Sequence, residues 1–251
     1  MIIFQYKDKT HKCVSEWSEI SLEKAVEVME VAESFPDNLK KLYHLSADEK
    51  KADEYNKVDK LISDKQRFKE IPAIYGKIIS LLSDVSDVDV NLWGPIERTA
   101  FYNDYIFKFV YGLIVSPFDY KAENIKDFEF RGETYYLPDS RMILGNEKPF
   151  ADVTALEFAE VADLEINSRE LTAGKYEVAA NIVAILCRPE GEVYDEEKAL
   201  IRAEKFKDLP MDIVWEVFFY TLSVSTLSRQ RKLIYLMRDH LKELQRQSDL
   251  D

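Results

Sequence analysis

The segment 96–115 carries more large apolar side chains than one face of a helix can hold. Gly94-Pro95 before it and Ser116-Pro117 after it are typical of the start and the end of a helix. Its aromatic residues are too many for a single face of that helix: Phe101, Tyr102, Tyr105, Phe107, Phe109 and Tyr111. Because a helix that is apolar on all sides must be surrounded by other elements, we expect this one at the centre of a mainly helical fold.

Apolar residues recur at helical spacing along most of the remaining chain. In the first helix that this spacing predicts, Ser18 or Ser21 is the expected N-cap, and Val26, Met29 and Ala32 form the expected buried stripe. The predicted helices, besides the central one, are 22–33, 36–43, 47–65, 71–82, 154–171, 176–187, 195–207, one from 212 and a last one carrying Leu233 to Leu244.

Three local signals predict where some of these helices begin or end. Residues 46–49 have the spacing of a capping box, which predicts the start of the charged helix 47–65. Valine alternates with Asp and Ser along 83–90, which predicts a loop or an edge strand. Gly174 predicts a break before the apolar helix 176–187, which we expect to end at Arg188-Pro189.

Two pairs of short alternating segments predict β-hairpins, 2–6 with 10–14 and 128–130 with 134–136. The expected fold class is therefore mainly α (α+β), a helical bundle with two small antiparallel β-hairpins. The segment between Pro138 and Pro149 has no periodicity. We expect an N-terminal α+β part over 1–137, a linker over 138–153 and a C-terminal helical bundle over 154–251, or one continuous domain.

The sequence lacks the residue clusters on which common catalytic and cofactor sites depend. All seven glycines are isolated, so no nucleotide-binding loop is present, and no serine lies in a G-x-S-x-G motif. His11 and Cys13 share a strand face but supply only two metal ligands, and His44 and His240 have no ligand partners in the sequence. We expect no enzyme activity, no cofactor and no metal. A Ser–His or Cys–His pair formed only on folding stays open as an alternative.

Composition restricts the partners and the compartment. The formal net charge is −13, which disfavours general binding to nucleic-acid backbones. Two distant cysteines fit a reducing compartment, and the N-terminal residues lack a signal-peptide pattern. The most apolar stretch, 211–227, contains Asp212 and Glu216, which indicates a buried helix rather than a membrane span. We expect no membrane partner, no small-molecule substrate and no direct recognition of a nucleic-acid sequence, although a local basic face could still bind nucleic acid.

The two signs of charge are concentrated in different parts of the chain. Residues 151–200 hold twelve acidic and four basic side chains, whereas 229–246 hold six basic and two acidic ones. Opposite patches on one chain favour head-to-tail association of copies, which closes as a ring. The alternative is that the basic helix docks on an acidic neighbour in its own chain. The candidate interface residues are Arg229, Arg231, Lys232, Arg238 and Lys242 on the basic side, and Glu157, Glu160, Asp195 and Glu196 on the acidic side.

Glu157 and Glu160 also share a predicted helix face, as paired acid–base carboxylates do. Such pairs are expected by chance among 47 acidic residues, so a solvated face is the favoured interpretation.

Several short blocks resemble a family of virion and tail-assembly proteins of tailed phages that infect Bacteroidetes, including crAss-like phages. The blocks are Trp17-Ser18-Glu19-Ile20-Ser21-Leu22, Val183-Ala184-Ile185-Leu186-Cys187-Arg188-Pro189, Tyr194-Asp195-Glu196, Phe206, Leu209-Pro210 and Phe218-Phe219. The resemblance implies a multi-copy ring, connector or sleeve around the portal and tail, or a chaperone of tail assembly, with no cofactor and no active site.

Three functions follow as hypotheses. The first is a virion structural protein, a ring or connector component of the neck or tail that is made in the cytoplasm of the bacterial host and contacts copies of itself and other virion proteins. The second is a tail-assembly chaperone that is absent from the mature particle. The third is an enzyme whose site is assembled from scattered acidic and aromatic residues.

Overall fold

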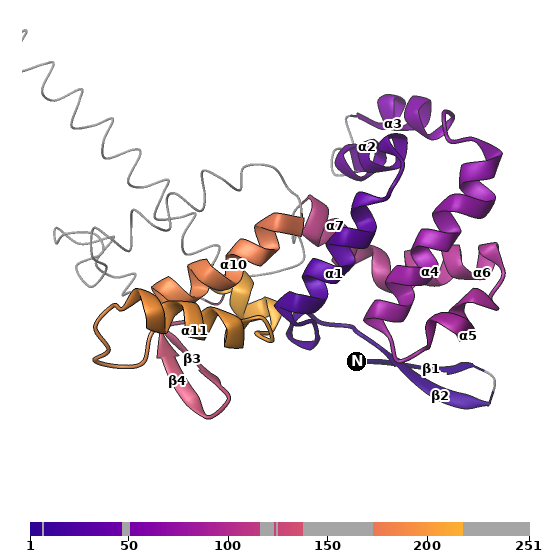
Figure 1. Cartoon of the computed structure of the whole chain (residues 1–251). Helices are drawn as coiled ribbons and strands as arrows, with labels where there is room; N and C mark the ends of the chain where they lie inside the picture. Colours follow the sequence, from indigo (N-terminus) through magenta and orange to yellow (C-terminus); the bar gives the residue numbers. More distant parts are fainter. Residues whose placement is uncertain (7, 47–50, 116–122, 124, 138–172, 218–251) are drawn as a thin grey trace, which may run out of the picture.

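The computed structural model describes residues 1–6, 8–46, 51–115, 123, 125–137 and 173–217. Within these residues the fold is mainly α with two small antiparallel hairpins, which confirms the predicted class (Figure 1). The helices are α1 Leu22–Glu33, α2 Asp37–Ser46, α3 Ala52–Asp59, α4 Ile71–Leu82, α5 Asp87–Asn91, α6 Pro95–Phe101, α7 Phe107–Ile114, α10 Ala173–Leu186 and α11 Glu196–Phe206. A further helical segment covers 211–217.

Helix α1 joins the two sides of the molecule, because it packs against α4, α7 and α10. Ser21 is its N-cap, as expected, and the Ser21 side chain accepts a hydrogen bond from the Lys24 N–H. The expected stripe is only partly right, since Met29 and Ala32 are buried but Val26 is half-buried. A helix that packs on several partners needs a wide apolar face, and the buried set is Leu22, Ala25, Val28, Met29 and Ala32.

Only the second half of the aromatic helix is central: α6 Pro95–Phe101 buries no residue and Ile96 is 76 % exposed, whereas the residues after Phe101 are mostly buried, and a π-helical turn joins the two halves. α6 continues through the π turn Tyr102–Ile106 into α7. Tyr102, Ile106 and Phe109 are fully buried. One side of the helix nevertheless reaches solvent, where Tyr105 is 37 % exposed. The π turn inserts one residue into the α-helical repeat, which changes the faces that α6 and α7 present to the core.

Both hairpins are present. β1 Ile2–Tyr6 pairs with β2 Lys9–Cys13, and β3 Asp127–Phe130 pairs with β4 Glu133–Tyr136. At the tip of the second hairpin Arg131 and Gly132 both have positive φ, of 54° and 78°, as a two-residue type I′ turn requires.

Three local predictions were wrong. Ser46 lies in the last turn of α2, where its hydroxyl donates to the Tyr43 carbonyl, so it does not begin the next helix. Residues 87–91 form α5, because the Ser86 side chain caps the Asp89 N–H and favours a helical turn over the extended conformation. Gly174 lies within the first turn of α10 and does not interrupt it.

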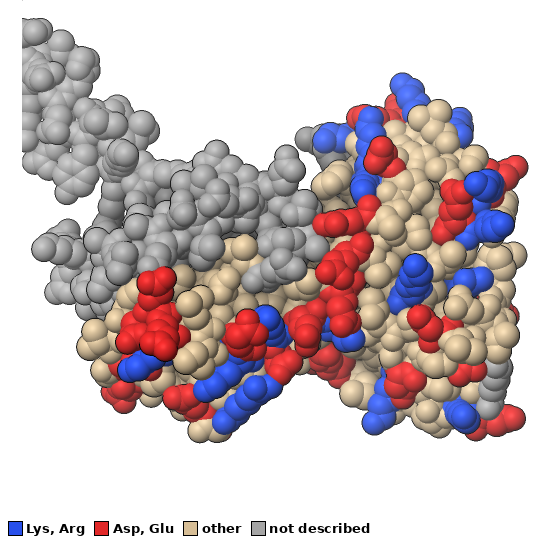
Figure 2. Space-filling view, in the orientation of Figure 1, with Lys and Arg blue, Asp and Glu red and all other residues tan. Residues whose placement is uncertain are grey.

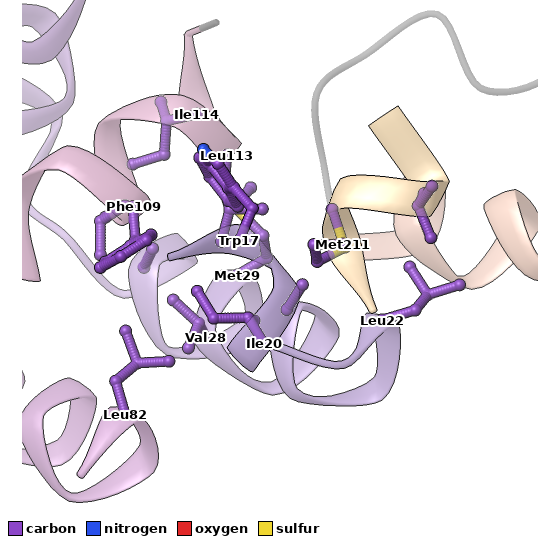
Figure 3. Close-up of a cluster of buried hydrophobic side chains, with 14 of the residues drawn as sticks. Trp17, Ile20, Leu22, Val28, Met29, Leu82, Phe109, Leu113, Ile114 and Met211 are labelled. Atoms are coloured by element: carbon purple, nitrogen blue, oxygen red, sulfur yellow. The ribbon is translucent and has the colours of Figure 1, made fainter. Parts of the chain in front are cut away.

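The start of α1 is joined directly to residues almost two hundred positions later. The Leu22 N–H donates to the Leu209 carbonyl at 2.8 Å, and the Met211 N–H donates to the Ile20 carbonyl at 2.8 Å. Trp17 makes edge contacts with Phe109 at 5.3 Å and with Trp215 at 5.6 Å between ring centroids. Figure 3 shows Trp17, Ile20, Leu22 and Met211 at this junction.

The described residues on both sides of the expected linker share one hydrophobic core. Ala180, Val183 and Ala184 of α10 are buried in it together with residues of α1. The linker 138–153 and the predicted helix 154–171 lie outside the described residues, so the division into 1–137 and 154–251 stays a prediction.

We predict that Trp17→Ala lowers the free energy of unfolding by about 3–5 kcal/mol, because it removes a buried aromatic side chain from the junction. The measurement is denaturant unfolding followed by both fluorescence and circular dichroism, with one coincident transition expected. The control Leu61→Ala removes a side chain that is 71 % exposed, and should change the free energy by less than about 0.5 kcal/mol. Two separate transitions, of which only one moves in Trp17→Ala, would show that the parts unfold independently.

Candidate protein–protein interface

The predicted interface residues that the structure describes lie at the start of α11. The Asp195 carboxylate caps this helix by accepting a hydrogen bond from the Lys198 N–H at 3.1 Å, and Glu196 follows in the first turn. Carboxylates at this end are stabilised by the unpaired N–H groups and the helix dipole. Both residues are exposed, as an interface requires.

The inner face of α11 is fixed by a buried arginine. Arg202 is 6 % exposed, donates to the carbonyl oxygens of Ala184 at 2.8 Å and Cys187 at 3.3 Å, and forms an ion pair with Glu192. Its guanidinium also lies 5.9 Å from the centre of the Tyr135 ring in β4. One side chain therefore connects the C-terminal end of α10, the turn before α11 and the second hairpin, and it holds the opposite face of α11 toward solvent.

That opposite face combines apolar and acidic side chains. We define the α11 outer face as Glu196, Glu197, Leu200, Ile201 and Glu204, all of which are exposed. Leu200 is 58 % exposed and Ile201 is 56 % exposed. In the turn before the helix, Val193 is 80 % exposed.

The carboxylates of this region differ in their partners. Glu204 forms an ion pair with Lys207 at 2.7 Å. Glu190, Glu196 and Glu197 have no hydrogen-bond or ion-pair partner within the part of the chain that the structure describes. In Figure 2, acidic side chains gather over the part of the molecule that holds α10 and α11 and over α1. Lys198 and Lys205 are also exposed on α11, one turn before and after Ile201, so the charge on that side is mixed, whereas the side that carries Glu196, Glu197 and Leu200 is acidic and favours a cationic partner.

The structure places only part of the predicted interface. Glu157, Glu160, Arg229, Arg231, Lys232, Arg238 and Lys242 lie outside the described residues, so their pairing with Asp195 and Glu196 stays a prediction. Leu200 and Ile201 were not among the predicted interface residues. A helical-wheel comparison would have found them, because they lie opposite the small and aromatic residues Ala199, Ala203 and Phe206 that α11 buries.

A second exposed apolar group lies around α5 and the start of α6. Val88 is 73 %, Leu92 is 65 % and Ile96 is 76 % exposed. Its acidic neighbours are already bonded within the protein: Asp84 accepts from the Lys12 N–H, Asp87 from Ser80, Asp89 from Ser86 and Glu97 from the Gly94 N–H.

The groups that could support chemistry are tied into the fold. His11 lies 3.0 Å from the Asp84 carboxylate. Burial raises the pKa of Cys13 to about 12 and raises the pKa of Cys187 above its ordinary value. Among the described residues, no group of three or more His, Cys, Asp or Glu side chains is placed to hold a metal ion, and no helix is long and apolar enough to cross a membrane.

Three tyrosines form a buried cluster between α2, α4 and the π turn. The rings of Tyr75 and Tyr102 stack with centroids 3.7 Å apart, and the hydroxyl groups of Tyr43 and Tyr102 are hydrogen-bonded to each other. Burial raises the pKa of Tyr75 to about 12 and raises those of Tyr43 and Tyr102 well above their ordinary value. The raised pKa values keep these hydroxyls protonated at neutral pH, where they pack within the core.

No protein-family model matches the chain, and neither the curated proteins nor the solved structures contain a significant match.

We predict that Arg202→Ala lowers the free energy of unfolding by about 3 kcal/mol, because it leaves two carbonyl groups and the Glu192 carboxylate without their buried partner. Lys205→Ala is the matched control, since Lys205 is an exposed cation in the same helix, and a change of less than about 0.5 kcal/mol is expected there. Urea unfolding of both variants measures the difference. Equal effects would mean that Arg202 is not the anchor of α11.

The tyrosine cluster predicts a loss of stability at alkaline pH. Because the folded pKa values lie above the unfolded value of 10.0, the contribution of these hydroxyls is complete below pH 10 and is lost as the pH rises through about 12. Tyrosinate absorbance and circular dichroism, measured in one alkaline titration, should show these tyrosines ionising only as the helices unfold. Complete ionisation of all 14 tyrosines with the helices intact would contradict this prediction.

Proposed function

We propose that this protein is a non-enzymatic assembly component, a multi-copy ring or connector of the neck or tail of a tailed phage. It is made in the cytoplasm of the bacterial host and is retained in the virion, where it contacts copies of itself and other virion proteins. The observation that carries the assembly role is the α11 outer face, which exposes Leu200 and Ile201 among carboxylates. The phage assignment is supported by the sequence resemblance alone.

Exposure of apolar side chains to water is unfavourable in free energy, and association removes this exposure. Burying an exposed leucine or isoleucine side chain is worth about 1.5–3 kcal/mol, so covering Leu200 and Ile201 is a substantial gain for a complex. Charged neighbours keep such a face soluble and select partners of the opposite sign. The basic segment 229–246 in the same chain supplies that sign, which supports self-association.

The α11 outer face also suits a chaperone of tail assembly, because a holding protein needs an exposed apolar surface that acidic groups keep in solution. The two functions differ in their location. A ring component is found in purified virions at many copies per particle, whereas a chaperone is absent from them.

We predict a discrete oligomer at high protein concentration, and a smaller mass as salt is raised, because charge pairs at an exposed interface are screened. Sedimentation velocity across a concentration series, repeated at low and high salt, gives the native mass. A single species of 29.3 kDa at every concentration and salt would contradict self-assembly of the chain alone.

A further inference from the structure

The α11 outer face has the pattern of a surface that receives an amphipathic helix. Leu200 and Ile201 form its apolar centre, Glu197 and Glu204 lie one helical turn before and after Leu200, and Lys198 and Lys205 border the far side of Ile201. A partner helix that suits this pattern presents an apolar stripe bordered by arginine and lysine.

The partners of the carboxylates distinguish this face from the apolar group on α5 and α6. There the acidic side chains are already engaged by the protein's own hydrogen bonds. Glu196 and Glu197 have no such partner among the described residues, so an incoming cation gains a full interaction with each. Of the two apolar surfaces, the α11 outer face is the one built for a basic partner.

The chain itself carries a segment of this chemistry. Residues 229–246 contain six basic side chains and two acidic ones, and their apolar residues recur at helical spacing: Leu233, Ile234, Met237, Leu241 and Leu244. As a helix the segment would be about 27 Å long, while the eleven residues of α11 extend over about 16 Å, so it is long enough to cover the whole face.

We infer that the outer face of α11 binds the segment 229–246 of a neighbouring copy of the chain. Leu200 and Ile201 pack against its apolar stripe, and Glu196 and Glu197 pair with Arg231, Lys232 or Arg238. The face is exposed in the single chain and is therefore available to a second copy. This inference rests on the proposed function and adds to it the two surfaces that meet.

The inferred contact is heterologous, because donor and acceptor are different surfaces of the chain. Every copy in a closed ring uses both of its surfaces. Two copies that each lack a different surface can still form one contact, and no more than one. A dimer that forms only when the two variants are mixed therefore indicates a heterologous contact. A contact within one chain would give no such dimer, and an isologous contact would not require two different variants.

The test uses two full-length variants. The acceptor variant carries Leu200→Lys and Ile201→Lys, and the donor variant carries Leu233→Asp and Leu241→Asp. Sedimentation velocity should give single chains for each variant alone, at concentrations where the unaltered protein is oligomeric. An equimolar mixture should give a species of twice the 29.3 kDa of one chain, and nothing larger.

Two further variants distinguish loss of the contact from loss of folding. Val88→Lys with Leu92→Lys changes equally exposed side chains on α5, and the oligomeric mass should stay unchanged. Arg231→Glu with Arg238→Glu is a second donor variant that retains the apolar stripe. Circular dichroism of every variant should match that of the unaltered protein.

Each other outcome overturns the inference. Oligomers that persist in the acceptor variant would remove α11 from the interface and leave the proposed assembly function standing. A mixture with no dimer would show that the segment docks within its own chain or on a different protein. If the unaltered protein never exceeds one chain in mass, both the inference and self-assembly of the chain fail.

Discussion

The structure depends on the junction at which the chain before α1 meets residues 209–215. Two backbone hydrogen bonds of 2.8 Å, Leu22 to Leu209 and Met211 to Ile20, hold the N-terminal end of α1. Trp17 fills the space above them and contacts both the central aromatic helix and Trp215. Because α1 also packs on α4, α7 and α10, the junction fixes the helix that these three share. It also brings α11 beside α10, since residues 207–211 lead directly from the end of α11 back to α1.

Much of the fold could be predicted from local patterns, and the errors have physical causes. The hairpins, α1, α4 and α11 follow from periodicity, turn residues and a serine or aspartate cap. In the segment 83–90 the expectation of a loop or an edge strand was right for 83–86, where Ser83 forms a bridge with Cys13, and wrong for 87–90, where the Ser86 cap outweighed the alternation of valines. The width of the buried face of α1 was underestimated, because the number of helices that surround it is a tertiary property.

The candidate interface was harder to predict than the fold. Acidic residues at the start of α11 are candidates for an interface, but such residues also stabilise a helix N-terminus, and Asp195 has that role as the N-cap. Leu200 and Ile201 look like core residues until the inner face of the helix is known, and that face is defined by Arg202, a residue type that is seldom buried. In α11 the usual distribution is reversed, because an arginine is buried and two aliphatic residues are exposed. Only the arrangement of Ala184, Cys187 and Glu192 around the guanidinium explains it.

The burial of both cysteines has a practical consequence for labelling the protein. Cys13 is 1 % and Cys187 is 0 % exposed, and a thiol whose pKa is raised by burial holds almost no thiolate at neutral pH. The chain contains no other cysteine, so we expect it to react only slowly with maleimides in its folded state. A single cysteine introduced at an exposed position therefore accepts one fluorophore or one gold cluster per chain, and the labels can then be counted and placed by microscopy.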